Sequence, residues 1–221
     1  MPFPYQAVLF DMDGTLVDSE RPYLAAETEV FARMGLPDAR ALALALVGIP
    51  VQESEALLRE RLGADFPLDR YRALRAEIRP ALIGEGIPAK PGARALLERL
   101  RREGVPLALA TSSMRENMEA HLRSAGLRDC FAVTACRDDV DQGKPAPDLY
   151  LLAARALGVD PARCVAVEDS NPGVAAAHAA GARVLLVPDT TKPDDAALAV
   201  ATLLPDLVAV EAELFGTVAP G

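Results

Sequence analysis

The segment covering residues 7–16, Ala-Val-Leu-Phe-Asp-Met-Asp-Gly-Thr-Leu, constrains the fold of this chain more than any other stretch. Its apolar half predicts a buried strand over residues 6–10, and two carboxylates, Asp11 and Asp13, follow where that strand ends. Side chains at positions i and i+2 of an extended chain point the same way, so the two carboxylates are placed to share a site. Because like charges repel, the pair needs an offsetting charge, and a divalent cation with oxygen ligands is the obvious candidate. An acidic turn after a strand is the plainer alternative.

The next part of the chain, residues 19–83, contains no predicted strand. Helical spacing and breaker residues predict four helices there, near residues 21–34, 38–47, 51–62 and 68–83. The segment 84–92 is dense in glycine and proline, which predicts a linker.

From residue 93 onward, predicted helices and strands alternate. The helices lie near residues 93–103, 115–125, 147–157, 172–180 and 205–215, and the strands near 105–110, 132–134, 164–167 and 183–187. Such alternation indicates a parallel sheet covered by helices on both faces. We expect an α/β protein with a doubly wound parallel-sheet core, residues 1–16 and 86–221, and an inserted all-helical domain, residues 17–85.

Polar residues follow several predicted strands of this core. In open α/β sheets, ligands bind at the carboxyl ends of the strands, so these residues are expected to converge on one crevice. Besides the first pair they are Thr111-Ser-Ser113, Lys144 in a Gly-Lys-Pro loop, and Glu168-Asp169.

Each of these groups also has a structural interpretation. The hydroxyls of residues 111–113 are suited to cap the next helix. Glu168 and Asp169 fit a solvated loop or a cap for the helix after Pro172, and Lys144 fits a surface lysine. The conjunction of four such groups in one order favours a functional site.

The composition limits the class of partner. A net charge of −9 and a pI of about 4.8 argue against general binding to nucleic acid or to an anionic membrane surface. No signal peptide is expected, and the longest apolar stretch, residues 41–51, is too short to span a bilayer. The cysteines, Cys130, Cys136 and Cys164, lack zinc spacing and are interpreted as free thiols in a reducing cytoplasm.

The motifs together resemble those of the haloacid dehalogenase-like (HAD) superfamily, over nearly the whole chain. The matching segments are Asp11-Met-Asp-Gly-Thr-Leu-Val-Asp18, Thr111-Ser-Ser, Lys144-Pro-Ala-Pro-Asp148 and Glu168-Asp-Ser-Asn-Pro-Gly173. The chain is most similar to the phosphatase and β-phosphoglucomutase-like subgroup, whose members are Mg²⁺-dependent phosphoryl-transfer enzymes. The resemblance implies a Rossmann-like core and identifies the helical insert as a cap domain.

The resemblance also implies a role for each core residue. Asp11 is the expected nucleophile and a metal ligand. Asp13 is the expected general acid and base, with its backbone carbonyl on the metal. Thr111 donates its hydroxyl to the phosphate, and Lys144 neutralises Asp11 and the phosphoryl oxygens.

The remaining expected site residues bind metal or substrate. Asp169 is the expected direct metal ligand, and Glu168 acts mostly through bound water. Gly14, Ser112 and Ser113 are expected to contact the substrate, with the Ser112 N–H at a helix N-terminus that favours anions.

Substrate selection is expected from the cap, where the candidates are Glu20, Arg21, Tyr23 and the loop at Gly48. Arg21 also fits an exposed arginine at a helix start, and Tyr23 fits packing within the cap. His121 and His178 are interpreted as ordinary helix residues.

The expected activity is hydrolysis of a small phosphorylated metabolite, similar to a sugar phosphate, through an aspartyl phosphate. A β-phosphoglucomutase-like mutase is the alternative, but the histidine and arginine that such mutases carry in the cap are replaced near Tyr23 and after Gly48. A catalytically retired binding protein is the alternative of another class. Dehalogenases do not need the metal site, and phosphonatases need a cap lysine, which residues 19–88 lack. A monomer or weak homodimer is expected.

Overall fold

The structure is a computed structural model that describes residues 3–46, 51–83 and 86–216. The chain divides into two compact units. One unit comprises Met1–Asp18 and Pro88–Gly221, and the other comprises Ser19–Ile87. We refer to them as the core unit and the helical unit. The boundaries between them lie two residues after those expected from the sequence at 16/17 and 85/86.

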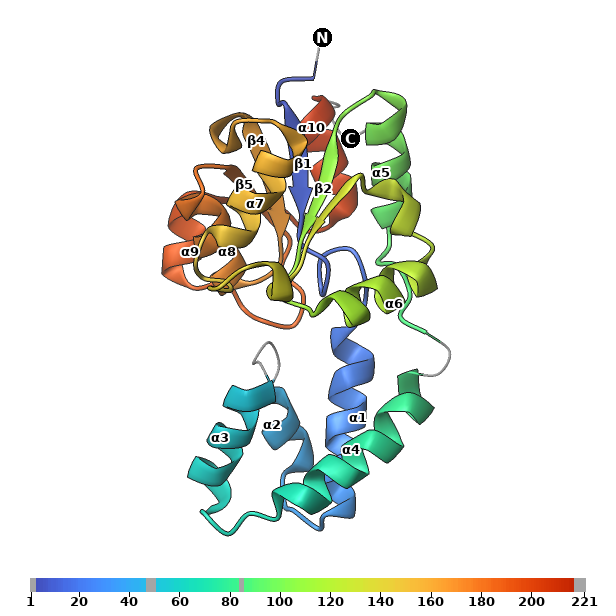
Figure 1. Cartoon of the computed structure of the whole chain (residues 1–221), viewed down its shortest axis with the longest axis vertical. Helices are drawn as coiled ribbons and strands as arrows, with labels where there is room; N and C mark the ends of the chain where they lie inside the picture. Colours follow the sequence, from blue (N-terminus) through green and yellow to red (C-terminus); the bar gives the residue numbers. More distant parts are fainter. Residues whose placement is uncertain (1–2, 47–50, 84–85, 217–221) are drawn as a thin grey trace. The chain divides into compact units, whose positions relative to one another are not determined.

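The core unit is built on one sheet of six parallel strands (Figure 1). The strand order is β3-β2-β1-β4-β5-β6, and all five pairings are parallel. The strands are β1 (Ala7–Phe10), β2 (Leu107–Ala110), β3 (Val133–Ala135), β4 (Cys164–Glu168), β5 (Arg183–Leu186) and β6 (Ala201–Leu203). The strand order reverses direction between β1 and β4, which makes that junction the topological switch point.

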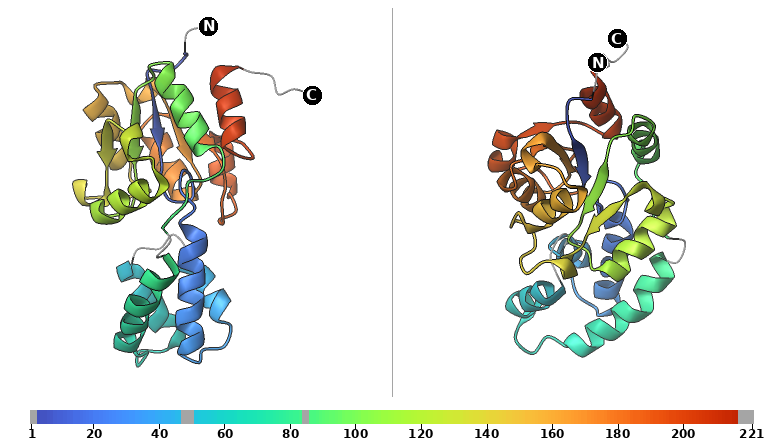
Figure 2. Two further views of the ribbon diagram at one scale, coloured as in Figure 1. Left: turned by 90° about the vertical axis from the view of Figure 1, so that its right-hand side faces the viewer. Right: turned by 45° about the horizontal axis from the view of Figure 1, so that its top comes forward.

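Helices cover both faces of this sheet. They are α5 (Ala93–Arg102), α6 (Arg115–Ala125), α7 (Asp148–Leu157), α8 (Asn171–Ala179), α9 (Asp195–Val200) and α10 (Leu207–Phe215). The views in Figures 1 and 2 show α7 and α8 on one face and α5 and α10 on the other. The predicted doubly wound α/β core is therefore confirmed.

Alternate residues of the strands explain why both faces need cover. Ala7 and Leu9 of β1 belong to a buried apolar cluster with Leu149 and Ala153 of α7. The intervening Val8 and Phe10 are fully buried as well, and the Phe10 ring packs edge-on against Phe131 at 6.2 Å between centroids. A strand that is apolar on both faces is stable only in the interior of such a layered structure.

The helical unit consists of α1 (Glu20–Arg33), α2 (Ala39–Leu44), α3 (Val51–Leu62) and α4 (Leu68–Ile83). Phe31 of α1 stacks on Tyr71 of α4, with 5.6 Å between ring centroids, inside a continuous apolar cluster. The Tyr71 hydroxyl donates to the buried Glu27 carboxylate at 2.9 Å, and Arg75 donates to the same carboxylate at 2.7 Å. This unit thus has its own core, which a separate domain requires.

The predicted helices over 51–62, 68–83 and 115–125 agree residue for residue with α3, α4 and α6. Sequence analysis did not predict α9 or β6, which lie between residues 195 and 203. β6 has only three residues and is held by its pairing with β5, so no local pattern identifies it. Among the described residues, no helix is long and apolar enough to cross a membrane. The three cysteines are free thiols, and Cys164 is buried in β4 as expected.

Candidate active site

The carboxyl ends of β1 and β4 bring the acidic motifs together. Phe10, the last residue of β1, is in register with Val167 of β4, which is followed by Glu168. The ladder continues one step further, because the Asp11 N–H donates to the Val167 carbonyl at 3.0 Å. Asp11 and Glu168 therefore lie side by side at the switch point, the place where open α/β sheets bind ligands.

Lys144 joins these two carboxylates. Its Nζ atom lies 2.5 Å from Oδ1 of Asp11 and 2.5 Å from Oε1 of Glu168, and its side chain is only 5% exposed. The alternative of a surface lysine is therefore wrong. The lysine comes from the loop that precedes α7, and its long side chain carries one positive charge between two buried negative ones.

Glu168 is the most enclosed carboxylate of the cluster. Its Oε1 accepts from Lys144 and, at 2.7 Å, from the hydroxyl of Tyr150 in α7. Its Oε2 accepts from the Asp169 N–H at 3.1 Å and from the backbone N–H and hydroxyl of Ser170. Buried charges are tolerated when they are paired and hydrogen-bonded in this way.

Two glycines let the backbone approach the carboxylates. A Cβ atom on Gly173, in the first turn of α8, would lie 1.9 Å from Oε1 of Glu168. A Cβ atom on Gly14 would lie 2.2 Å from Oδ2 of Asp169, and Gly14 also has a φ of +85°, which disfavours any side chain. Gly14, predicted to bind substrate, thus lies directly against Asp169.

Three carboxylates are arranged to hold a metal ion. Oxygen atoms of Asp11, Glu168 and Asp169 lie within 4.8 Å of one another, and all three residues are buried. The Thr15 hydroxyl donates to Oδ1 of Asp169 at 3.2 Å and orients it. An all-oxygen, multiply charged donor set suits a hard divalent cation such as Mg²⁺. The side chain of Asp13 is not part of this cluster of described residues.

Asp13 is held instead by the segment after β2. The Ser113 hydroxyl donates to its Oδ2 at 2.7 Å, and Nδ1 of His121 lies 3.0 Å from its Oδ1. Thr111 is fully buried, and its Oγ1 accepts from the Ser113 N–H at 3.0 Å. The hydroxyls of residues 111–113 do not cap α6, which begins at Arg115 without a side-chain cap.

Ser112 is exposed in the same segment. Ser112 stands three positions before Arg115, the first residue of α6. The expectation that its N–H lies at a helix N-terminus is therefore wrong. The other capping alternative also fails, because the side-chain cap of α8 is Ser170, which accepts from the Gly173 N–H, and not Glu168 or Asp169.

The electrostatics of the cluster follow from burial. Burial raises the pKa of the Asp11 carboxyl to about 8, against the opposing effect of Lys144. Burial also opposes the charge on Lys144, but Asp11 and Glu168 together raise its pKa above the usual value and keep it protonated. Burial and the Glu168 charge raise the pKa of Tyr150 well above its ordinary value, so its hydroxyl remains a donor.

The cap candidates belong to the helical unit. Glu20, Arg21 and Tyr23 lie in the first turn of α1, where Arg21 is exposed. The Arg79 guanidinium of α4 lies over the Tyr23 ring, 4.7 Å from its centroid, so that ring packs within the unit. Gly48 lies outside the described residues.

Sequence analysis missed three residues of the site. Tyr150, His121 and Gly173 each contact a motif carboxylate. The interpretation of His121 as an ordinary helix residue is wrong, whereas His178 is exposed on α8. The signal for Tyr150 is its place in the first turn of α7, the helix that follows Lys144. Gly173 is the last residue of the motif that begins at Glu168, and a glycine inside a helix is itself a sign of close packing.

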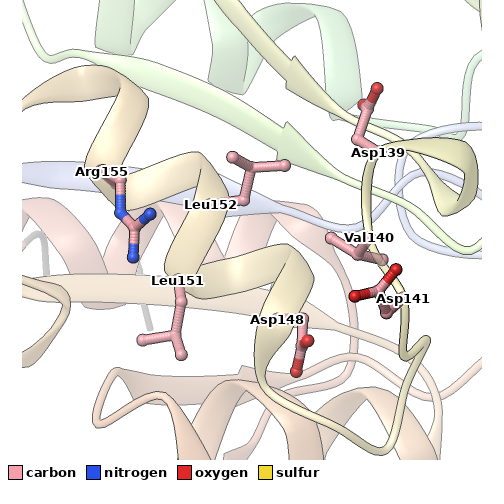
Figure 3. Close-up of a pocket in the computed structure, with 7 residues that line it drawn as sticks. All are labelled: Asp139, Val140, Asp141, Asp148, Leu151, Leu152 and Arg155. Atoms are coloured by element: carbon pink, nitrogen blue, oxygen red, sulfur yellow. The ribbon is translucent and has the colours of Figure 1, made fainter.

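A separate hollow of about 350 Å³ lies beside α7 (Figure 3). Asp139, Asp141 and Asp148 line it together with Leu151 and Arg155. The carboxylates of the site, Asp11, Asp13, Glu168 and Asp169, are not among its lining residues, and neither is Lys144. This hollow is therefore distinct from the site described above.

Comparisons with known proteins agree with this geometry. The sequence model of the haloacid dehalogenase-like hydrolases matches residues 5–181. The CbbY protein of Rhodobacter capsulatus is 37% identical over 204 residues, which cover 86% of this chain and 88% of that protein. The phosphorylated carbohydrates phosphatase of Thermotoga maritima is 36% identical over 176 residues, which cover 80% of this chain and 82% of that protein.

A solved structure gives the same result for the fold. The crystal structure of CbbY from Rhodobacter sphaeroides in complex with phosphate matches with a TM-score of 0.76 at 34% identity, covering 93% of this chain and 96% of that chain. The predicted membership of the haloacid dehalogenase-like superfamily is therefore confirmed. This chain belongs to the haloacid dehalogenase-like hydrolases and is an enzyme of their phosphatase subgroup.

Proposed function

We propose that this enzyme hydrolyses a small phosphorylated metabolite, similar to a sugar phosphate, with the help of Mg²⁺ and through an aspartyl phosphate on Asp11. The observation that carries the proposal is the contact of Lys144 with both Asp11 and Glu168, next to Asp169 and at the carboxyl end of β1. Relatives named as phosphatases of phosphorylated carbohydrates support the class of substrate.

Electrostatics decide what the reaction requires. A phosphate dianion about 3.5 Å from a carboxylate is repelled by about 9 kcal/mol at an effective dielectric constant of 20. Three carboxylates and one ammonium leave the cluster with a formal charge of −2 when all are ionised. A dianion therefore approaches only if further positive charge compensates this excess.

Mg²⁺ fits that requirement. The residues proposed to hold it are Asp11, the backbone carbonyl of Asp13, and Asp169, with Glu168 acting mostly through bound water. The engagement of Glu168 by Lys144 and Tyr150 supports its indirect role. When bound, the cation supplies charge compensation for the carboxylates and the phosphoryl oxygens.

The protein's own residues carry the bond changes. In the first step, a carboxylate oxygen of Asp11 bonds to phosphorus and the bond from phosphorus to the ester oxygen breaks. The ester oxygen keeps the electron pair, takes the proton of the Asp13 carboxyl and leaves as an alcohol. In the second step, a water oxygen attacks the phosphorus and gives one proton to Asp13. The bond to Asp11 then breaks, and phosphate is released.

The remaining residues bind and orient the phosphoryl group. Lys144 neutralises Asp11 and the transferred oxygens, and Thr111 offers the hydroxyl proton that its contact with Ser113 does not use. Gly14, Ser112 and Ser113 are proposed as further substrate contacts. Glu20, Arg21, Tyr23 and Gly48 of the proposed cap domain are proposed to select the leaving group.

The proposal is tested by measuring phosphate release from a panel of hexose, pentose and polyol phosphates, with Mg²⁺ and then with EDTA. We expect release that requires Mg²⁺ and is abolished in Asp11→Asn. Acid-quenched mass spectrometry is expected to find a phosphoryl group on the peptide that contains Asp11. Activity retained by Asp11→Asn would refute the nucleophile. Interconversion of sugar phosphate isomers without net release would favour the mutase, and no reaction of any ester would favour a binding protein.

A further inference from the structure

His121 contacts the proposed acid and base of the reaction from a distant part of the chain. It lies in the second turn of α6, is buried, and places Nδ1 3.0 Å from Oδ1 of Asp13. The other oxygen of Asp13 accepts from the Ser113 hydroxyl at 2.7 Å. Both oxygens of the Asp13 carboxylate are thus contacted, one by Ser113 in the loop after β2 and the other by His121 in α6.

The side chain of Asp13 differs from the neighbouring carboxylates in its exposure to solvent. It is 28% exposed, whereas that of Asp11 is 9% exposed and that of Glu168 is fully buried. The backbone turns at Gly14, directly after Asp13, with a φ of +85°. The contacts that fix the direction of the Asp13 carboxyl come from outside this turn, from the Ser113 hydroxyl and from Nδ1 of His121.

Proton transfer depends on this orientation. A general acid contributes only when its oxygen lies within hydrogen-bond reach of the atom that takes the proton. We infer that His121 is a positioning residue, which holds the Asp13 carboxyl in the direction of the leaving oxygen. This inference rests on the proposed function. The proton that moves is the one on Asp13 throughout, and the N–H of His121 and the O–H of Ser113 stay on their own atoms.

How much the reaction depends on the proton of Asp13 varies with the leaving group. This dependence distinguishes a positioning role of His121 from a merely structural one, which would affect all leaving groups equally. An alkyl oxygen needs a proton to depart, whereas p-nitrophenolate departs without one. The value of kcat/KM reports the steps up to departure of the alcohol, so it isolates this proton transfer from the later attack of water. We would measure it with β-glycerol phosphate and with p-nitrophenyl phosphate.

The variants are His121→Leu, His121→Asn and the control His178→Asn on the exposed face of α8. We expect His121→Leu to lower kcat/KM about 10–100-fold for the alkyl ester and less than about threefold for the aryl ester. We expect His121→Asn, whose side-chain amide nitrogen can donate a hydrogen bond to Asp13 in place of the ring nitrogen, to recover most of the loss. His178→Asn should behave as the wild type with both esters.

Thermal unfolding of each variant shows whether it folds, and the Asn variant keeps the test valid if the Leu variant does not. Equal losses with the two esters, or no loss with the alkyl ester, would overturn the inference while leaving the proposed function intact. Failure of the wild type to release phosphate from either ester would instead overturn the proposed function, and the inference with it.

Discussion

The Nζ atom of Lys144 lies 2.5 Å from Oδ1 of Asp11, although 133 positions separate the two residues in the sequence. The same atom is equally close to Glu168, so one buried cation serves two buried carboxylates. Removing one partner of such a group leaves uncompensated charge, which is strongly destabilising.

We therefore expect Lys144→Met to destabilise the core unit by about 3–5 kcal/mol and to lower kcat by at least about 10²-fold. Chemical denaturation and phosphate-release kinetics measure the two effects. The matched control is Lys192→Met, at an exposed lysine of the same unit, which should change neither. A fully active Lys144→Met enzyme would contradict the role given to this side chain.

The raised pKa of Asp11 predicts a pH dependence of stability. Burial raises the pKa of Asp11 in the folded state to about 8, above the usual value of 3.8, so the folded state holds this proton more tightly. The corresponding stability is present in full below 3.8 and is lost as the pH rises through about 8.

In EDTA, we expect the Tm of Asp11→Asn to rise relative to that of the wild type as the pH increases from about 5 to about 8. The asparagine has no charge to bury, so it escapes the loss. Differential scanning calorimetry at several pH values measures the difference. A difference that does not vary with pH would show that burial does not control the ionisation of Asp11.

Tyr150→Phe removes the hydroxyl that donates to the buried Glu168. We expect a loss of about 1.5–3 kcal/mol, because the acceptor is charged and enclosed, together with a reduced kcat through the looser placement of Lys144. Tyr71→Phe is the matched control, since its hydroxyl donates to the buried Glu27 of the helical unit. That variant should lose similar stability, measured by urea denaturation, but should change the chemistry less. Equal kinetic effects of the two variants would argue against a specific role for Tyr150.

Gly173→Ala should be destabilising despite the general preference of helices for alanine. The added Cβ would meet the carboxylate of Glu168 at 1.9 Å, which forces either the helix or the carboxylate to move. We expect a net loss of about 1–3 kcal/mol in urea denaturation and a lower kcat. Ala179→Ser, at an exposed position of the same helix, is the control and should be near neutral. A stabilised Gly173→Ala would mean that the carboxylate moves freely.

Thr15→Val should weaken metal binding without removing a proposed ligand. The Thr15 hydroxyl donates to Asp169 at 3.2 Å, and partners that orient a ligand contribute to affinity. We expect the Mg²⁺ concentration for half-maximal activity to rise about 10–100-fold, with kcat at saturating Mg²⁺ less affected. Thr28→Val, whose hydroxyl donates to a carbonyl within α1, is the control. An unchanged Mg²⁺ requirement would show that Thr15 does not orient the ligand.

The sequence by itself determined most of the helices and strands and the order of the motifs. Apolar runs, glycine and proline breakers and helical spacing are local properties, so the bounds of α3, α4 and α6 could be read from them. The topology of parallel strands then placed Asp11 and Glu168 at one edge of the sheet, because successive strand ends face the same side.

Only the tertiary structure decided which side chains meet there. Tyr150 on Glu168, His121 on Asp13 and Gly173 against Glu168 depend on how helices pack on the sheet, which no local pattern specifies. Likewise β6 forms because β5 offers an edge for pairing. Its three residues are too few for a hydrophobic pattern that would predict a strand. Local propensity selects elements, whereas burial and long-range hydrogen bonds select the contacts between them.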